Sequence, residues 1–236
     1  HTVGFLGDGI NDAPAIHQAD CGLSVDTATD VARAAADLIL LAPDLAVLAD
    51  GVAEGRRTYA NIMKYVRMGT SSNFGNMLSM AIASVFIPFL PLTPVQVLLN
   101  NLLYDTSETG IPFDDVEPDE TARPHGWDMR EVLRFTLVMG SLSSVFDLLT
   151  FAVLIWGFDA APEQFRAAWF LESMSTQILV VFLIRTSLPF WRSLPHPALL
   201  ATSLGALAVA FALVLGPTGA TLGFGGPGPK MLLVIA

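Results

Sequence analysis

The stretch VGFLGDGINDAPAI, residues Val3–Ile16, decides how the first part of the chain folds. It opens with an apolar run typical of a short buried strand, crosses a loop with two aspartates beside glycines, and ends in a run typical of a helix. Pro14 falls in the first turn of that helix, where its missing N–H costs little, and Asn11 or Asp12 is placed to cap it. The stretch therefore predicts a strand, a polar loop and a helix in succession.

The same alternation continues to residue 42. Residues 21–25 (CGLSV) and 37–41 (DLILL) have the pattern of two more strands, and residues 26–36 between them have the pattern of a second helix. Strands and helices that alternate at this spacing indicate a parallel sheet. We therefore expect residues 1–43 to form part of an α/β domain. Three strands are too few to close a core on both faces, so we expect an N-terminal part of the same polypeptide to complete it.

The composition indicates a membrane protein. Of the 236 residues, 53% are hydrophobic and 14% are charged, whereas roughly a quarter of the residues of soluble domains are charged. The net charge of −10 argues against nucleic-acid binding, because phosphate backbones need Lys and Arg. The single cysteine excludes an internal disulfide, and no signal peptide is predicted. The chain begins at His1 and ends in an apolar run, as expected for a fragment of a longer protein.

From Asp44 the pattern is helical. Residues 44–72 predict an amphipathic helix that links the α/β part to the membrane and carries a basic cluster. Long apolar segments follow, each close to the roughly 20 residues that a membrane span needs. We therefore expect residues 73–236 to form an all-α transmembrane bundle with about five complete spans and a truncated sixth. The expected spans are Asn73–Leu92, Pro94–Ile111, Leu133–Trp156, Ala167–Ile184 and Ala198–Leu215, and the sixth begins at Met231.

The basic residues predict the orientation of these spans. If the α/β part is cytosolic, only Arg166 and Lys230 among the 12 Lys and Arg residues fall in outside loops. Cytosolic loops of membrane proteins carry the excess of Lys and Arg. The bias therefore places residues 1–72 in the cytosol.

Polar residues inside the expected spans are candidate ligands, because intramembrane polar groups are costly. The first span carries Asn73 and Asn76, and the second carries Asn100, Asn101 and Asp105. Asn101 and Asp105 are four residues apart and share a helix face. An ionised carboxylate in lipid needs a positive partner, and no Lys or Arg lies within that span, which favours a bound cation. For Asn73 and Asn100, hydrogen bonds between helices are an equally open interpretation.

Three further acids lie near or within the spans. Glu108, one turn beyond Asp105, is predicted to be a solvated acid at the cytosolic end of its helix. Asp147 and Glu172 each lie within a span beside Ser or Thr residues. We expect both to hydrogen-bond one helix to another, and a role in tuning an ion site is the alternative.

The loop Gly7–Asp12 is a candidate phosphate and metal site. A strand delivers Asp8 to the edge of the sheet, where ligands of open α/β sheets bind. Gly7 and Gly9 permit close approach of a phosphate or a metal. Mg²⁺ binds through one or two carboxylates together with phosphate oxygens and waters. Asp8 fits as such a ligand and Asp12 as its water-mediated partner; the alternative is an ordinary turn in which Asp12 only caps a helix.

The order of these motifs is similar to that of the P-type cation-transporting ATPases. GDGIND is followed by AADLILL and then by a helix that carries GRRTYANIMKY. Four further segments most resemble the bacterial magnesium-transporting branch: SSNFGN, PFLPLTPVQVLLNNLLYD, IPFDDVEPD and SSVFDLLTF. The resemblance implies a haloacid-dehalogenase-like, Rossmann-like phosphorylation domain, a bacterial inner-membrane location, and Mg²⁺ import driven by ATP through an aspartyl-phosphate.

The resemblance also implies roles for individual residues. Asp8 and Asp12 would hold the catalytic Mg²⁺, Asn11 would position the phosphorylated group, and Gly7 and Gly9 would line the cofactor loop. The pattern NLLYD would place Asn101 and Asp105 at the transported cation. Asn76 and Asn73 would complete the visible part of that site.

The chain contains no DKTGT segment with its phosphorylated aspartate and no nucleotide-binding domain, so the fragment alone is expected to be inactive. Calcium pumps of the family have an acid at the position of Asn76, and an amide-rich site suits Mg²⁺, which sheds water reluctantly. Two alternatives stay open: an ATPase for Ca²⁺ or Mn²⁺, and a non-catalytic membrane protein whose α/β part docks a partner.

Overall fold

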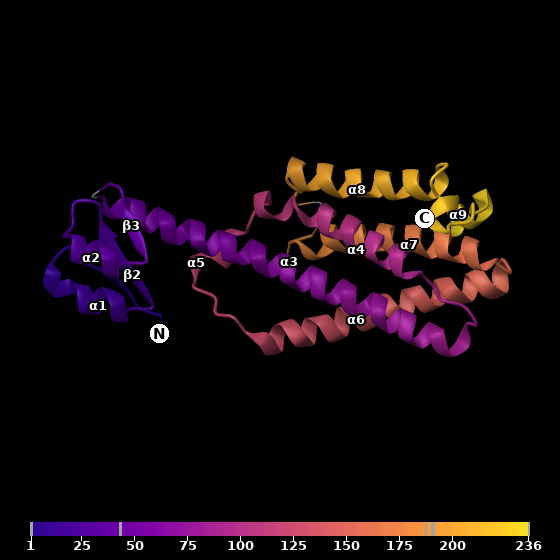
Figure 1. Ribbon diagram of the computed structural model, residues 1–236, viewed down its shortest axis with the longest axis horizontal. Helices are drawn as coiled ribbons and strands as arrows, with labels where there is room; N and C mark the ends of the chain where they lie inside the picture. Colours follow the sequence, from indigo (N-terminus) through magenta and orange to yellow (C-terminus); the bar gives the residue numbers. More distant parts are fainter. Residues whose placement is uncertain (1, 43, 187, 190–191, 236) are drawn as a thin grey trace. The chain divides into compact units, whose positions relative to one another are not determined.

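The computed structural model describes residues 2–42, 44–186, 188–189 and 192–235. The chain divides into two compact units, His1–Arg57 and Thr58–Ala236. Figure 1 traces the elements of each unit along the chain.

The first unit contains a parallel three-stranded sheet with the order β1-β2-β3. Gly4 of β1 pairs with Cys21 of β2, and Leu23 of β2 pairs with Leu38 of β3. The predicted alternation of strands and helices is therefore confirmed. Along the chain the elements are β1 (Gly4–Leu6), a 3₁₀ turn (Ile10–Asp12), α1 (Ala13–Gln18), β2 (Cys21–Val25), α2 (Asp30–Ala35) and β3 (Leu38–Leu40).

The expected linking helix and the first expected span form one continuous helix, α3 (Leu45–Phe86), of 42 residues. This helix ends at Phe86 rather than at the predicted Leu92. The reason lies in the prolines that follow, at positions 88 and 91. Proline disfavours helical backbone in the residue before it and donates no backbone hydrogen bond.

The second unit continues with helices whose starts are set by proline or by a capping side chain. α4, α7 and α8 have a proline in the first turn, and the Asp128 side chain caps α6 by accepting a hydrogen bond from Arg130 N. α6 and α7 therefore begin before the predicted Leu133 and Ala167. The helices are α4 (Pro94–Glu108), α5 (Pro118–Ala122), α6 (Met129–Ala152) with a π-helical extension (Val153–Gly157), α7 (Pro162–Ile184), α8 (Pro197–Leu215) and α9 (Pro229–Ile235).

Helix α7 is the core of the second unit. In the most apolar stretch of α7, 61% is buried inside the structure, against 28% in the corresponding stretches of α6 with its extension and of α8. α8 lies beside both α4 and α7 (Figure 1). The Phe151 ring is 4.8 Å from Trp169 and 5.0 Å from Phe165. α3 and α6 meet at small residues: a Cβ on Gly140 would lie 2.8 Å from the Ser71 carbonyl oxygen, so a side chain at 140 does not fit.

Among the described residues, three helices are long and apolar enough to cross a membrane. They are Met129–Gly157, Pro162–Ile184 and Pro197–Leu215. α4 has only 15 residues, fewer than the roughly 20 of a straight span, and the part of α3 from Asn73 onward is rich in small and polar residues. The two expected spans of α3 and α4 therefore stay predictions.

Candidate functional site

The GDGIND loop leaves the end of β1, at the carboxyl edge of the sheet. Gly7 N donates to Leu23 O at 3.1 Å, and Ser24 Oγ donates to Gly7 O at 2.9 Å. On its far side, Thr29 N and Thr29 Oγ1 donate to Asp8 O at 3.0 and 3.2 Å. The loop is thus held between β1, β2 and the cap of α2. Asp8 and Asn11 are exposed, and the structure shows no hydrogen bond to the Asp8 carboxylate within the described residues.

The Asp12 carboxylate closes this loop rather than capping α1. Its Oδ2 accepts from Gly9 N at 3.0 Å and from Asp8 N at 3.2 Å, and Asp12 makes no side-chain cap bond to α1. A Cβ on Gly7 would lie 2.5 Å from Asp12 Cβ. Glycine at position 7 therefore lets Asp12 turn back over the loop. The arrangement leaves the Asp8 carboxylate as the group that can take an external ligand.

The structure spreads the four predicted transport residues over separate environments. Asn73 and Asp105 are exposed, while Asn76 and Asn101 are partly buried. Ser173 Oγ of α7 donates to Asn76 Oδ1 at 3.3 Å, and Gln177 Nε2 donates to Ser173 Oγ at 2.6 Å. No hydrogen bond in the described part of the chain joins these four residues to one another. In this unit, therefore, Asn76 is tied to α7, and Asp105 is available to other groups.

Asp147 links three helices, as predicted. Its Oδ2 accepts from Ser79 Oγ of α3 at 2.6 Å, and its Oδ1 accepts from Trp169 Nε1 of α7 at 2.9 Å. The exposed fraction of Asp147 is 3%. Glu172 is also buried, and the structure provides no hydrogen-bond partner for its Oε2 among the residues it describes.

The prediction of a solvated Glu108 is wrong. Glu108 is 2% exposed, whereas Asp105, three residues earlier, is exposed. α4 turns the side of Asn100, Tyr104 and Glu108 into the bundle, and both amide atoms of Asn100 have no partner in the part of the chain that is described. Hydrogen bonding of Asn100 to another helix is therefore not seen in this unit.

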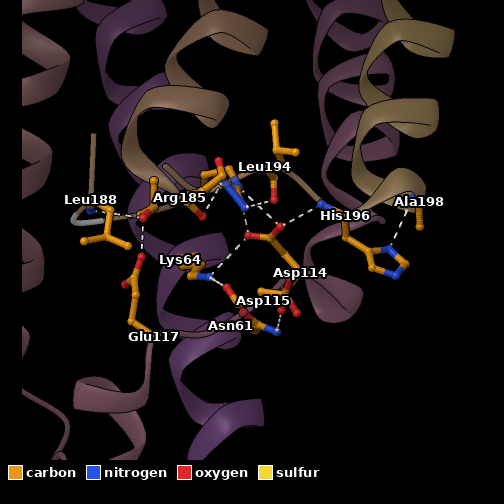
Figure 2. A network of polar contacts seen from close by, with 12 residues as sticks. Asn61, Lys64, Asp114, Asp115, Glu117, Arg185, Leu188, Leu194, His196 and Ala198 are labelled. Atoms are coloured by element: carbon orange, nitrogen blue, oxygen red, sulfur yellow. Dashed lines mark hydrogen bonds and ion pairs between the residues drawn. The ribbon is translucent and has the colours of Figure 1, made fainter. Parts of the chain in front are cut away.

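A second polar site, which the sequence interpretation did not identify, is centred on Asp114. Figure 2 shows its carboxylate enclosed by donors from three segments. Arg185 Nε at the end of α7 lies 3.2 and 3.0 Å from the two oxygens, Lys64 Nζ of α3 lies 3.3 Å from Oδ2, and His196 N donates to Oδ1 at 3.2 Å. The three charged side chains are 0 to 8% exposed.

The backbone around Asp114 is fixed by the same segments. Asn61 Nδ2 donates to Pro112 O at 3.2 Å and to Asp114 O at 3.1 Å, and Lys64 Nζ also donates to Asp115 O at 2.8 Å. Lys64 and Arg185 entered the sequence interpretation only among the basic residues that predict orientation, and Asp114 was assigned no role. Lys64 and Arg185 are 50 and 71 positions away from Asp114, and no local sequence pattern indicates contacts over such separations.

No group of three or more His, Cys, Asp or Glu side chains is placed to hold a metal ion within the described ranges. Mg²⁺ requires fewer protein ligands than such a group supplies, because it binds through one or two carboxylates and keeps several waters. The donor sets at Asp8 and at Asp105 are compatible with that coordination.

The chain is similar to known cation pumps. The family described as "Cation transporting ATPase, C-terminus" matches residues 89–236. The chain is 48% identical over 222 residues to "Magnesium-transporting ATPase, P-type 1" of Salmonella typhimurium and 47% identical to the protein of the same name from Escherichia coli, in both cases over 92% of this chain and 25% of the relative. It is also 45% identical over 106 residues to "Calcium-transporting ATPase" of Bacillus subtilis, over 44% of this chain and 12% of the relative.

The chain thus spans about a quarter of the length of the magnesium-transporting relatives. The matched region, residues 89–236, covers more than half of the 236-residue chain. It includes α4, Asp114 and the three apolar helices found among the described residues. The chain therefore belongs to the family of P-type cation-transporting ATPases and carries its C-terminal membrane region.

Proposed function

We propose that this chain is the C-terminal part of an ATP-driven Mg²⁺ transporter in the bacterial inner membrane. The observation that carries the proposal is 48% identity to a magnesium-transporting ATPase over 92% of the chain. On this proposal residues 1–43 belong to the cytosolic phosphorylation domain, residues 44–72 link it to the membrane, and residues 73–236 form the membrane domain. The first two spans of that domain come from α3 and α4.

The first unit fits one edge of a phosphorylation site. Its parallel strands and the Gly7–Asp12 loop are compatible with a haloacid-dehalogenase-like domain that other residues of the polypeptide complete. Asp8 would ligate the catalytic Mg²⁺, and Asp12 would order the loop through Gly9 N and Asp8 N. Asn11 would position the phosphorylated aspartate, and Gly7 and Gly9 would let the phosphate approach. Charge neutralisation by Mg²⁺ is what phosphoryl transfer from ATP requires.

The second unit would supply part of the cation path. Asp105 is one of two acids in α4, and no Lys or Arg lies within this helix. Asn101 shares its face, and Asn76 presents an amide from α3. Together with Asn73, these residues give an oxygen-rich and weakly charged set, which suits a divalent cation that keeps part of its water shell.

Substitution of Asp8 tests the proposal in the full-length pump reconstituted in proteoliposomes. We expect Asp8→Asn to abolish ATP-driven Mg²⁺ uptake and the acid-stable phosphoenzyme. Asp50→Asn, which neutralises an exposed acid of α3, should leave both unchanged. Normal uptake by the Asp8→Asn pump would overturn the assignment.

Calcium transport is a second candidate, favoured by the 45% identity to the calcium-transporting relative. Competition separates the two ions. A Mg²⁺ pump should show ATPase activity that rises with Mg²⁺ beyond the amount needed to form Mg·ATP and that Ca²⁺ does not replace. Stimulation by micromolar Ca²⁺ at fixed Mg²⁺ would favour the second candidate.

A further inference from the structure

A cleft of about 530 Å³ opens between α3 and the end of α4. Its polar lining consists of Thr58, Asn61, Tyr65, Asp105, Glu108 and Thr109, and its other lining residues are apolar. No Lys or Arg is among the residues that line it. The cleft therefore contains two acids without a basic partner in its wall.

Glu108 is the distinctive residue of this cleft. It is 2% exposed, and neither carboxylate oxygen has a hydrogen-bond partner of good geometry in the described residues, although the Tyr104 hydroxyl lies nearby. Buried charges in proteins are normally paired or coordinate a metal. A Cβ placed on Gly69 would lie 3.7 Å from Glu108 Oε2, so α3 approaches the carboxylate at a position without a side chain. The carboxylate is thus buried without the partner that its charge requires.

A second residue of the cleft lining, Asn61, also carries an oxygen that can bind a cation. Asn61 is 4% exposed and uses its Nδ2 to hold the Asp114 loop, but its Oδ1 is buried and has no partner in the described part of the chain. Asp105, which is exposed, lies three residues before Glu108 and also lines the cleft. Thr58, Tyr65 and Thr109, which carry hydroxyl groups, complete the polar lining.

We propose that Glu108, Asn61 and Asp105 form a second divalent-cation site at the end of α4, beside the transport site. All of its donors are oxygen atoms, and hard cations such as Mg²⁺ prefer oxygen ligands. Mg²⁺ keeps several waters when one or two carboxylates bind it, and a cleft of about 530 Å³ has room for a hydrated ion, since a water occupies about 30 Å³.

This second site deepens the proposed function, and it rests on that proposal for the side of the membrane that the end of α4 faces. If residues 1–72 are cytosolic, the end of α4 faces the cytosol, and the cleft is where a cation enters or leaves the transport site. Asp105 then belongs to both sites, and Glu108 belongs to the cleft alone. An ion in the cleft would neutralise the buried Glu108 and pass to the Asn101 and Asp105 face of the same helix.

Direct ion binding tests the proposal without ATP. Mn²⁺ serves as the paramagnetic probe, and its binding to the 236-residue chain in lipid nanodiscs is measured by electron paramagnetic resonance, with Mg²⁺ as competitor. We expect Glu108→Gln to weaken Mn²⁺ binding roughly tenfold or more. Glu163→Gln, which neutralises an exposed acid at the start of α7, should bind Mn²⁺ like the unchanged chain.

A second variant separates loss of a ligand from loss of fold. Glu108→Asp keeps the charge and should restore part of the affinity, while circular dichroism confirms equal helix content in all variants. Wild-type affinity in Glu108→Gln, or no Mn²⁺ binding by the unchanged chain, would overturn the site. The tests of the proposed function can fail independently, because normal uptake by the Asp8→Asn pump, or stimulation by Ca²⁺ in place of Mg²⁺, would leave Mn²⁺ binding at Glu108 intact.

Discussion

Arg185 holds both carboxylate oxygens of Asp114 from the end of α7, with Nε at 3.2 and 3.0 Å. The two side chains are 2% and 0% exposed. This contact joins the segment after α4 to the end of α7. Lys64 of α3 contacts the same carboxylate (Figure 2). Because a buried charge is costly without its partner, the three segments are held in one arrangement.

Asp114→Ala should therefore destabilise the second unit strongly. The substitution leaves Lys64 and Arg185 buried without their acid, and breaking a buried pair in this way costs about 3–5 kcal/mol. Unfolding in detergent, followed by tryptophan fluorescence, measures the loss. Asp115→Ala is the matched control, because the Asp115 side chain is exposed and only its carbonyl oxygen takes part. Equal losses in the two variants would contradict the central role of Asp114.

Trp169→Phe tests the Asp147 network. The substitution keeps an aromatic ring against Phe151 but removes the Nε1–H that lies 2.9 Å from Asp147 Oδ1. A buried acceptor left without its donor costs about 1–3 kcal/mol, so the thermal midpoint should fall. Trp156→Phe changes a side chain that is 85% exposed and should leave the midpoint unchanged. A midpoint unaffected by Trp169→Phe would show that Ser79 alone satisfies Asp147.

The sheet and the apolar helices could be predicted because their signals are local. Each strand is encoded within its own few residues, as in β2 (Cys21–Val25), and α8 is a single apolar run. The helix ends were less predictable. The prediction extended the first span to Leu92, although Pro88 and Pro91 stop α3 at Phe86, and it started α7 after the proline that opens it.

The sites were predictable only where one short segment contains them. Asp8 and Asp12 share a loop, so their proximity was visible in the sequence. Glu108 was misjudged because its burial depends on how α4 rotates against α3, which places Asp105 outward and Glu108 inward. Asp114 was missed for a related reason, since its two cationic partners are 50 and 71 residues away.

Gly7→Ala should destabilise the loop of the first unit. The new methyl group would lie 2.5 Å from Asp12 Cβ, and inserting a carbon into so close a contact costs typically 1–3 kcal/mol. Amide hydrogen exchange of residues 4–18 should become faster. Gly4→Ala is the control, because its nearest contact would be an ordinary 3.5 Å. Unchanged protection in Gly7→Ala would mean that Asp12 can turn away from the loop at no cost.

Removal of the Asp12 carboxylate should loosen the Gly7–Asp12 loop, whereas removal of the Asp8 carboxylate should not. Asp12→Ala removes the acceptor of Gly9 N and Asp8 N, so the loop should lose about 1 kcal/mol, comparable to the loss of a helix cap. Asp8→Ala removes an exposed carboxylate for which the described residues provide no donor, so amide protection should not change. Hydrogen exchange of the chain measures both effects without ATP. If Asp8→Ala loosens the loop as much as Asp12→Ala does, Asp8 has a structural role, and loss of transport in Asp8→Asn could no longer be assigned to a missing Mg²⁺ ligand.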